Sequence, residues 1–322
     1  MKHYFIINPA AGSGKDQEVL LPRIMNAAKS CGVDYEIHRT SGPGEAVTYA
    51  RGRLSENEGE PARFYSCGGD GSASEILNGI YGTPGAELAI IPAGSGNDYV
   101  RNFGDKACFC DIMALINGAA EPVDVIKYTY TPLRKEGADE VTSYALNMIN
   151  MGFDAKVVRH MVRMKNRFFL KGTGAYVAGV VRELADYKMS RAVFRPEGEE
   201  AFETDILLAG VGSGRYSGGG FDGIPIAEVN DGLLDLMIIK PLKRGKFIKL
   251  VGIYHDGKHL ENPELAELLL LYRTKKVEIE PVMPLVFTAD GEVLFTANLV
   301  TVSVAPDKIP FVIPDGLAQP KK

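Results

Sequence analysis

The stretch SCGGDGSASEILNG, residues 66–79, decides the fold that this sequence predicts. It follows an apolar run, residues 62–67, so the pattern indicates a strand, a glycine-rich turn and then a helix. We expect Ser72 to be the N-cap of that helix and Glu75 to complete a capping box. A helix start favours an anion, but the Asp70 carboxylate would repel a phosphate there unless a cation lay between them. The stretch therefore indicates a magnesium–nucleotide site, and the alternative is an ordinary strand–helix turn.

Two further glycine-rich turns follow strand patterns in the first third of the chain. Residues 3–8 lead into PAAGSGK at 9–15, and residues 88–91 lead into PAGSGND at 92–98. The first turn is similar to a Walker A loop but lacks its pattern, because Asp16 stands where Ser or Thr is required. Strand, loop and helix recur four times, which predicts a parallel sheet with all strand-to-helix loops along its carboxyl edge. We therefore expect the three turns to converge on one nucleotide site.

In combination, these turns resemble the diacylglycerol kinase catalytic domain, a superfamily that includes soluble bacterial diacylglycerol kinases and kinases of phosphatidylglycerol, sphingosine or ceramide. The matching positions are Asn8-Pro9, Gly12, Gly14, Gly69 to Ser72, Glu75, Asn78-Gly79 and Pro92 to Asp98. The resemblance implies an ATP-binding α/β domain of the type found in NAD kinases and phosphofructokinases. The residues that it assigns to ATP are Asn8, Pro9, Ala10, Ala11, Gly12, Thr40, Gly68, Gly69, Asp70, Gly71, Ser72, Ala73, Ser74, Glu75, Ser95, Asn97 and Asp98. The chain departs from the usual family pattern at three positions, where Ser72 replaces Thr, Ser74 replaces Asn and Tyr99 replaces Phe.

After Asp124 the alternation of strands and helices stops, and strand patterns dominate. They lie at residues 125–130, 141–149, 191–195, 202–211, 233–239, 275–280, 285–288, 293–296 and 300–305. The pattern predicts an antiparallel β domain, and the resemblance implies a β-sandwich after which the chain returns to the first domain. We therefore expect an ATP-binding domain of residues 1–124 with 306–322, and a lipid-substrate domain of residues 125–305.

The catalytic residues follow from the resemblance rather than from local pattern. Asp290-Gly291 lies between alternating apolar residues, which by itself indicates only a hairpin. The resemblance makes Glu292 the general base, with Asp290 assisting it, and adds Asp70 as a ligand of the magnesium that accompanies ATP.

A second magnesium, with a structural role, is also implied by the resemblance. Its ligands would be Glu228, Asp231 and the main-chain carbonyl of Leu233. Hard oxygen ligands suit magnesium, which keeps water in its remaining positions. The alternative is that residues 230–232 only form a turn before the next strand.

A basic helical insertion is expected at about residues 155–187, where no acidic residue occurs between Asp154 and Glu183. One face of this helix carries Lys156, Arg159, Arg163 and Arg167. We expect this face to contact an anionic membrane, because each Lys or Arg near such a surface contributes about 1 kcal/mol. The alternative is a basic face that is simply solvated.

Composition limits the remaining possibilities. The net charge of -5 argues against nucleic acid as the main partner. No apolar run approaches the roughly 20 residues of a membrane-spanning helix, and the first strand pattern leaves no room for a signal peptide. Four cysteines suggest no disulfide framework, so we expect a cytoplasmic protein that visits the membrane peripherally.

The predicted function is ATP- and magnesium-dependent phosphorylation of a lipid hydroxyl, with diacylglycerol as the expected substrate and phosphatidic acid as the product. One alternative is a kinase of phosphatidylglycerol, sphingosine or ceramide, and another is an NAD kinase. A third is a membrane-associated nucleotide-binding protein without catalysis. The resemblance also allows a homodimer, because relatives can dimerise.

Overall fold

The structure is a computed structural model that describes residues 1–12, 16–57, 59–94, 96–133, 139–153, 155–158, 189–291 and 293–317. Contacts within the chain define two compact units. The first unit contains residues 1–125 together with the C-terminal stretch from Pro306, and the second contains residues 126–305. In the described part of the chain, no helix has both the length and the apolar character needed to cross a bilayer.

The first unit is built on a six-stranded sheet with the strand order β2-β1-β3-β4-β20-β5. These strands are β1 (Lys2–Ile7), β2 (Asp34–Arg39), β3 (Ala62–Gly68), β4 (Ala86–Pro92), β5 (Ala119–Val123) and β20 (Ile309–Ile313). Strands β1 to β4 are parallel to their neighbours, as predicted, and β20 runs parallel to β4 and antiparallel to β5. Every residue of β3 is buried, as expected for a parallel strand with both faces covered.

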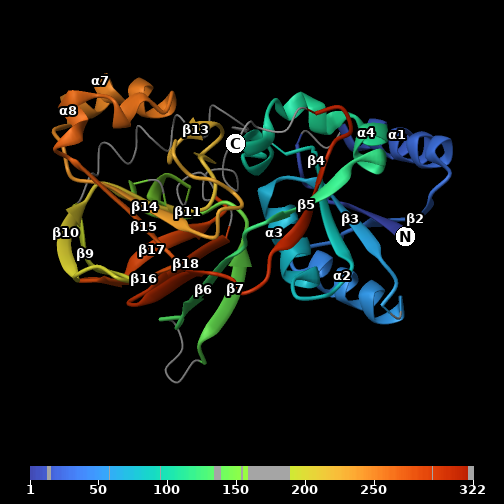
Figure 1. Ribbon diagram of the computed structural model, residues 1–322, viewed down its shortest axis with the longest axis horizontal. Helices are drawn as coiled ribbons and strands as arrows, with labels where there is room; N and C mark the ends of the chain where they lie inside the picture. The colour runs from blue at the N-terminus through green and yellow to red at the C-terminus, as the bar shows by residue number, and fades with distance from the viewer. Residues whose placement is uncertain are drawn as a thin grey trace. The chain divides into compact units, whose positions relative to one another are not determined.

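Helices cover both faces of this sheet, as Figure 1 shows. Helices α1 (Asp16–Cys31) and α4 (Ile112–Asn117) lie on one face, and α2 (Glu45–Glu56) and α3 (Asp70–Ile80) lie on the other. Two short 3-10 helices, η1 (Tyr99–Phe103) and η2 (Lys106–Cys110), follow β4. This doubly wound arrangement places the ends of β1, β3 and β4 along one edge of the sheet.

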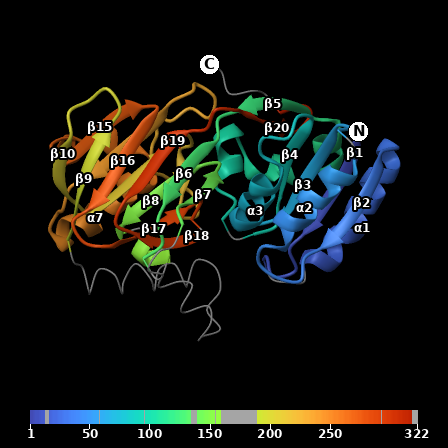
Figure 2. The same ribbon diagram turned by 90° about the horizontal axis from the view of Figure 1, so that it is seen from below.

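The second unit contains two six-stranded antiparallel sheets. The first has the order β10 (Phe202–Ile206), β9 (Ser190–Pro196), β16 (Lys276–Pro281), β19 (Val300–Val304), β6 (Ile126–Tyr130) and β7 (Val141–Ala145). The second has the order β15 (Leu269–Thr274), β14 (Leu234–Ile239), β11 (Leu208–Gly212), β8 (Met148–Gly152), β17 (Leu285–Ala289) and β18 (Val293–Ala297). Figure 2 shows the strands of the first sheet side by side. The expected antiparallel β domain is confirmed.

Two of the expected strands were wrong in their extent. The run at 141–149 forms two strands, β7 and β8, and the run at 202–211 likewise forms β10 and β11. In each case the two strands belong to different sheets. The residues at the corners, Leu146 and Asn147 in the first run and Leu207 in the second, include no Gly or Pro that would mark a break between two strands.

Several elements of the second unit had no counterpart in the sequence analysis. They are β12 (Tyr216–Ser217), β13 (Phe221–Asp222), α7 (Arg244–His255), η3 (Lys258–Leu260), α8 (Pro263–Ala266) and β15.

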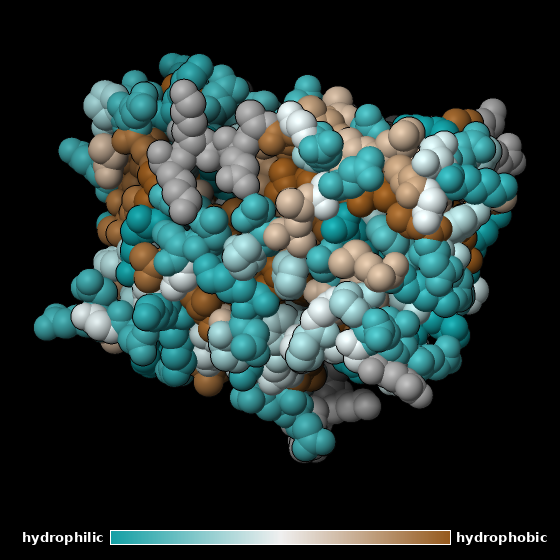
Figure 3. All heavy atoms as spheres, turned by 45° about the vertical axis from the view of Figure 1, so that its right-hand side comes forward, coloured by the Kyte–Doolittle hydropathy of each residue, from teal (hydrophilic) through white to brown (hydrophobic). Residues whose placement is uncertain are grey.

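Successive residues of the second sheet belong alternately to two apolar clusters. Ile149 and Met151 of β8 face the core shared with the other sheet, which also contains Phe194 and Phe287. Met148 of the same strand belongs to a separate cluster, together with residues of α7. This period of two is that of a β-strand with both faces covered. On the face drawn in Figure 3, hydrophilic side chains predominate and apolar ones are exposed between them.

Candidate active site

The turn after β3 is built differently from the predicted capping box. Helix α3 begins at Asp70 with Gly69 as its N-cap, and the N–H of Ser72 already donates to the carbonyl of Gly69 at 3.1 Å. Ser72 therefore lies inside the first turn and is not the N-cap. Glu75 does not return to this turn either, because its Oε1 accepts the N–H of Gly44 at 2.9 Å. The capping box was wrong because both side chains have partners on neighbouring loops.

The loops after β3 and β4 touch through their glycines. The N–H groups of Ala93 and Gly94 both donate to the carbonyl of Gly68, at 2.9 and 3.0 Å. A Cβ on Gly94 would lie 2.5 Å from the Cα of Gly69, so the two backbones approach this closely only because Gly94 has no side chain.

Replacing Gly94 with Ala should therefore separate the two loops. The expected result is a loss of about 1–3 kcal/mol in the free energy of unfolding, the usual cost of overpacking, together with weaker ATP binding. The matched control is Gly52→Ala in α2, where a Cβ meets no atom within 4 Å. Urea denaturation and ATP titration of both variants test this, and equal behaviour of the two would show that the contact is unimportant.

Asn97 ties the same two loops together with its side chain. Its Oδ1 accepts the N–H of Gly94 at 2.9 Å, and its Nδ2 donates to the carbonyl of Gly68 at 2.9 Å. The side chain is almost fully buried, at 1% exposure, and the backbone has a φ of 56°. Asn tolerates this left-handed conformation better than most residues. Asn97 is thus a structural link inside the site.

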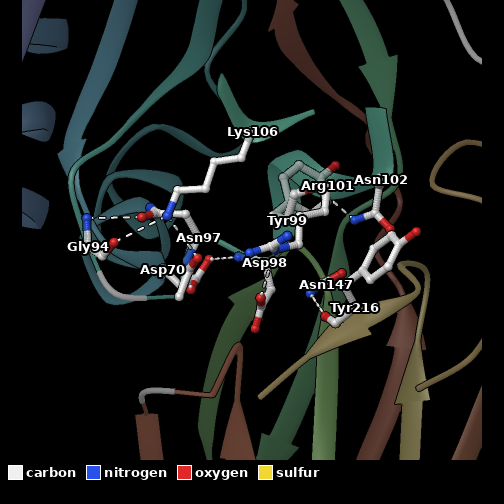
Figure 4. A network of polar contacts seen from close by, with 11 residues as sticks. Asp70, Gly94, Asn97, Asp98, Tyr99, Arg101, Asn102, Lys106, Asn147 and Tyr216 are labelled. Atoms are coloured by element: carbon white, nitrogen blue, oxygen red, sulfur yellow. Dashed lines mark hydrogen bonds and ion pairs between the residues drawn. The ribbon is translucent and has the colours of Figure 1, made fainter. Parts of the chain in front are cut away.

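Asp70 completes the junction from the start of α3. Its Oδ2 accepts the N–H of Asn97 at 2.7 Å and its Oδ1 accepts the N–H of Asp98 at 3.0 Å (Figure 4). A Cβ on Gly96 would lie 2.6 Å from Oδ2, so the loop fits closely around the carboxylate. A carboxylate oxygen that accepts a main-chain N–H can also bind a hard cation such as magnesium.

Lys106 is a charged residue of this site that the sequence analysis missed. It begins η2, and its Nζ donates to the carbonyls of Gly94 and Gly96 at 3.3 and 3.2 Å (Figure 4). Burial lowers the pKa of Lys106, and the nearby positive charge of Arg101 lowers it further. A lysine in a short helix has no local signal for this role, since only the fold brings it to the loop.

The loop after β1 joins the junction of the β3 and β4 loops through Asn8. The side chain of Asn8 donates from Nδ2 to the Oγ of Ser72 at 2.9 Å and accepts the N–H of Ala10 at 2.9 Å. Thr40 holds the end of β1, because its N–H and hydroxyl both donate to the carbonyl of Ile7, at 2.9 and 3.4 Å. The three loops that the sequence pattern placed at one edge are therefore joined by hydrogen bonds.

Not every residue assigned to ATP has a side chain that is accessible. Ala73 and Ser74 are 2% and 3% exposed, so neither offers an accessible side chain to a ligand. Ser95 lies outside the described residues.

In the second unit, Asp290 supports the corner between β7 and β8. The strands β17 and β18 form a hairpin, and both Asp290 and Gly291 have positive φ, 48° and 70°. The Asp290 carboxylate accepts the N–H groups of Leu146, Asn147 and Met148 at 2.9, 2.9 and 3.1 Å. Desolvation raises the pKa of Asp290, and these three N–H groups oppose that shift. Glu292, the predicted base, lies outside the described residues.

The predicted structural magnesium ligands offer suitable oxygen atoms, but one carboxylate already has partners. Asp231 accepts the N–H of Leu233 at 3.0 Å on Oδ1 and pairs with Arg273 at 2.6 Å on Oδ2, while Glu228 is exposed. Among the residues that the structure describes, no group of three or more His, Cys, Asp or Glu side chains could hold a metal ion. A magnesium ion bound to Oδ2 of Asp231 would lie close to the Arg273 guanidinium, whose positive charge repels a second cation.

The predicted membrane face is described only at its beginning. Lys156 lies in the short helical stretch 155–158, whereas Arg159, Arg163 and Arg167 fall outside the described residues.

An apolar pocket lies on the outer face of the second sheet, beneath α7. Leu208 and Ile239 line it from the sheet, Phe153 lines it from just after β8, and Phe247, Leu250, Val251 and Tyr254 line it from α7. Its cavity volume is about 40 Å³, room enough for water, but the lining offers water few hydrogen-bond partners. The pocket is therefore suited to hydrocarbon.

Comparisons with known proteins cover nearly the whole chain. The family described as "Diacylglycerol kinase catalytic domain" matches residues 2–128, and the one described as "YegS C-terminal NAD kinase beta sandwich-like domain" matches residues 147–313. The first match contains the three joined loops, and the second contains the Asp290 hairpin.

Individual relatives agree with these matches. A Pseudomonas aeruginosa protein named "Probable lipid kinase YegS-like" is 30% identical over 260 residues, 79% of this chain and 78% of that protein. A Mycobacterium tuberculosis protein named "Diacylglycerol kinase" is 30% identical over 217 residues, 66% of this chain and 65% of that protein. A crystal structure titled as a diacylglycerol kinase from Bacillus anthracis superposes with a TM-score of 0.69 at 21% identity, covering 98% of each chain. This last likeness shows the shared fold.

Proposed function

This chain belongs to the diacylglycerol kinase catalytic domain family and is a lipid kinase, and from that premise we propose that it transfers the γ-phosphate of ATP to diacylglycerol and forms phosphatidic acid. The observation that carries the proposal is the junction of three strand-end loops around Asp70. Such an edge of a parallel sheet is where nucleotide phosphates bind. Diacylglycerol is favoured among lipids because the M. tuberculosis relative carries that name.

ATP binding is assigned to the first unit. Its glycine-rich turns leave main-chain N–H groups at the start of α3 for the phosphates, and Lys106 adds a positive charge beside them. One helix start stabilises an anion by only about 0.3–1 kcal/mol, so a triphosphate requires further positive charge. When bound, magnesium supplies that charge. Asp70 is the residue proposed to hold it, directly or through water.

Proton removal is assigned to Glu292. Its carboxylate would accept the proton of the lipid hydroxyl while the hydroxyl oxygen forms a bond to the γ-phosphorus and the bond to the leaving ADP oxygen breaks. Asp290 would support this step by holding the 146–148 corner. Glu228, Asp231 and the Leu233 carbonyl remain the proposed ligands of a structural magnesium.

Lipid binding is assigned to the second unit. Its apolar pocket beneath α7 offers a hydrocarbon-lined site for the end of an acyl chain. Peripheral contact with an anionic membrane through Lys156, Arg159, Arg163 and Arg167, a cytoplasmic location and a homodimer all stay predictions.

An NAD kinase would share this fold, because the second family match is described as similar to the NAD kinase β-sandwich. The match of the first unit to the diacylglycerol kinase catalytic domain favours a lipid instead. The kinase relatives likewise argue against a protein without catalysis.

Incubating the purified protein with ATP labelled in its γ-phosphate tests the proposal. The acceptors are diacylglycerol, phosphatidylglycerol, sphingosine, ceramide and NAD, each with and without magnesium. We expect labelled phosphatidic acid, formed only when magnesium is present. Label in another lipid would correct the substrate, and label in NAD alone would reverse the assignment to lipids.

A further inference from the structure

The loop assigned to the structural magnesium lies beside an arginine of the edge strand β15. Arg273 is directly opposite Asp235 in the antiparallel pair of β14 and β15. Its Nε lies 3.0 Å from Oδ1 of Asp235, and its Nη2 donates to Oδ2 of Asp231 at 2.6 Å. One guanidinium therefore bridges a carboxylate of the loop and a carboxylate of the strand that follows it.

The two carboxylates differ in their access to solvent. Asp235 is 1% exposed, whereas the side chain of Asp231 is 20% exposed. A buried carboxylate is unfavourable unless a positive group compensates its charge. Within the described part of the chain, Arg273 forms the only salt bridges of these two side chains. The pairing is therefore needed most by Asp235, and Asp231 shares it.

Both oxygens of Asp231 already face groups of positive character. Oδ1 accepts the N–H of Leu233 at 3.0 Å, and Oδ2 accepts from Arg273. The planar guanidinium presents several N–H donors in a fixed fork, so different nitrogens can serve the two carboxylates at once. A cation bound to this loop would have the same electrostatic role that the arginine already has.

We propose that Arg273 is the resident cation of this loop and keeps its affinity for magnesium low. A magnesium ion on Asp231 would lie next to a guanidinium bound to the same carboxylate, and the repulsion between the two positive charges opposes binding. Magnesium also dehydrates reluctantly, so it needs oxygens whose charge is not yet compensated. The inference rests on the proposed function only for the choice of Glu228, Asp231 and Leu233 as ligands.

Magnesium titration of the full-length protein without nucleotide tests the role of Arg273. Isothermal titration calorimetry compares wild type with Arg273→Gln, which removes the guanidinium charge and keeps a polar side chain. We expect the variant to bind magnesium at least about tenfold more tightly, because the repulsion is gone. The double variant Arg273→Gln/Asp231→Asn should lose this gain, since it removes the proposed metal-binding carboxylate.

Thermal unfolding provides a second readout on the same proteins. Without metal, Arg273→Gln should unfold about 5–10 °C below wild type, since Asp235 is left buried without its positive partner. Magnesium at about 100 times its Kd should restore several degrees, because it binds the folded state. The same concentration should change the Tm of wild type by less than about 1 °C, measured against sodium chloride of equal ionic strength.

Arg195→Gln is the matched control. Arg195 and Arg273 have the same side-chain exposure, 41%, and Arg195 pairs with Glu280 at 2.6 Å in the other sheet of the unit. Its partner is exposed, so the control should keep the Tm and the magnesium response of wild type. Three results would each overturn the role of Arg273: no added magnesium response in Arg273→Gln, an equal response in the control, or a response that survives in the double variant.

Wild type compared with Asp231→Asn decides the question even if Arg273→Gln does not fold. Asn keeps an oxygen for the N–H of Leu233, so the turn should be retained. Equal magnesium affinity of the two proteins supports the role of Arg273, and a tight wild-type site that Asp231→Asn removes refutes it. These titrations use neither ATP nor lipid. A protein that phosphorylates no lipid would therefore refute the proposed function and leave the magnesium result unchanged.

Discussion

Replacing Glu292 with Gln should lower kcat for lipid phosphorylation by about 10²- to 10⁴-fold, the usual contribution of a general base. The amide has nearly the shape of the carboxylate but cannot accept the hydroxyl proton. ATP binding should be unchanged, because the residues assigned to ATP belong to the first unit. Single-turnover kinetics and ATP titration of the same preparation separate the two effects.

Glu280→Gln is the matched control for this prediction. Glu280 is an exposed carboxylate of the same unit, paired with Arg195 at 2.6 Å, so its loss should leave kcat within about twofold because surface ion pairs contribute little. Turnover retained by the Glu292 variant would remove this residue from the role of base. Asp290 would then be the next candidate for the general base, although its carboxylate already accepts three main-chain N–H groups.

Replacing Asp70 with Asn should lower activity about 100-fold or more and weaken the dependence of ATP binding on magnesium. The substitution removes the negative charge proposed to hold the metal. It also leaves one N–H of Asn97 or Asp98 facing an amide donor, because Asn has a single acceptor oxygen. An unpaired donor costs about 1–3 kcal/mol of stability, so urea denaturation should detect the change as well.

Asp111→Asn separates the catalytic effect from the structural one. Asp111 is the N-cap of α4 and also accepts two main-chain N–H groups, those of Met113 and Ala114. Asn is an equally good N-cap, so this control should retain both stability and activity. If the Asp70 variant lost stability but kept the magnesium dependence of wild type, Asp70 would be a structural residue only.

The site residues differ in how far sequence could predict their contacts. The edge of the sheet followed from the strand, turn and helix order, because parallel strands always bring their carboxyl ends together. The capping box failed at the same place, since Ser72 and Glu75 bond to Asn8 and Gly44 rather than to each other. Local rules treat a helix start as isolated, whereas these side chains have partners on separate loops.

The corners at which the chain crosses from one sheet to the other were less predictable from the sequence. The runs at 141–149 and 202–211 read as single strands, although each crosses from one sheet to the other. The sequence analysis did not predict helix α7, whose residues Phe247, Leu250 and Tyr254 line the pocket on the second sheet. Lys106 could not be assigned to the site from local sequence, because its Nζ contacts the carbonyls of Gly94 and Gly96, which lie 12 and 10 residues earlier in the chain.

The sequence by itself determined the two classes of sheet and the edge where the glycine-rich turns meet. Periodicity and turn chemistry act between residues close in the chain, so a single sequence displays them. Only the tertiary structure decided that Asp70 and Asn97 lock those turns together, that Lys106 lies beside them and that α7 covers an apolar pocket. Each of these contacts depends on which distant segments pack against one another, and no local pattern carries that information.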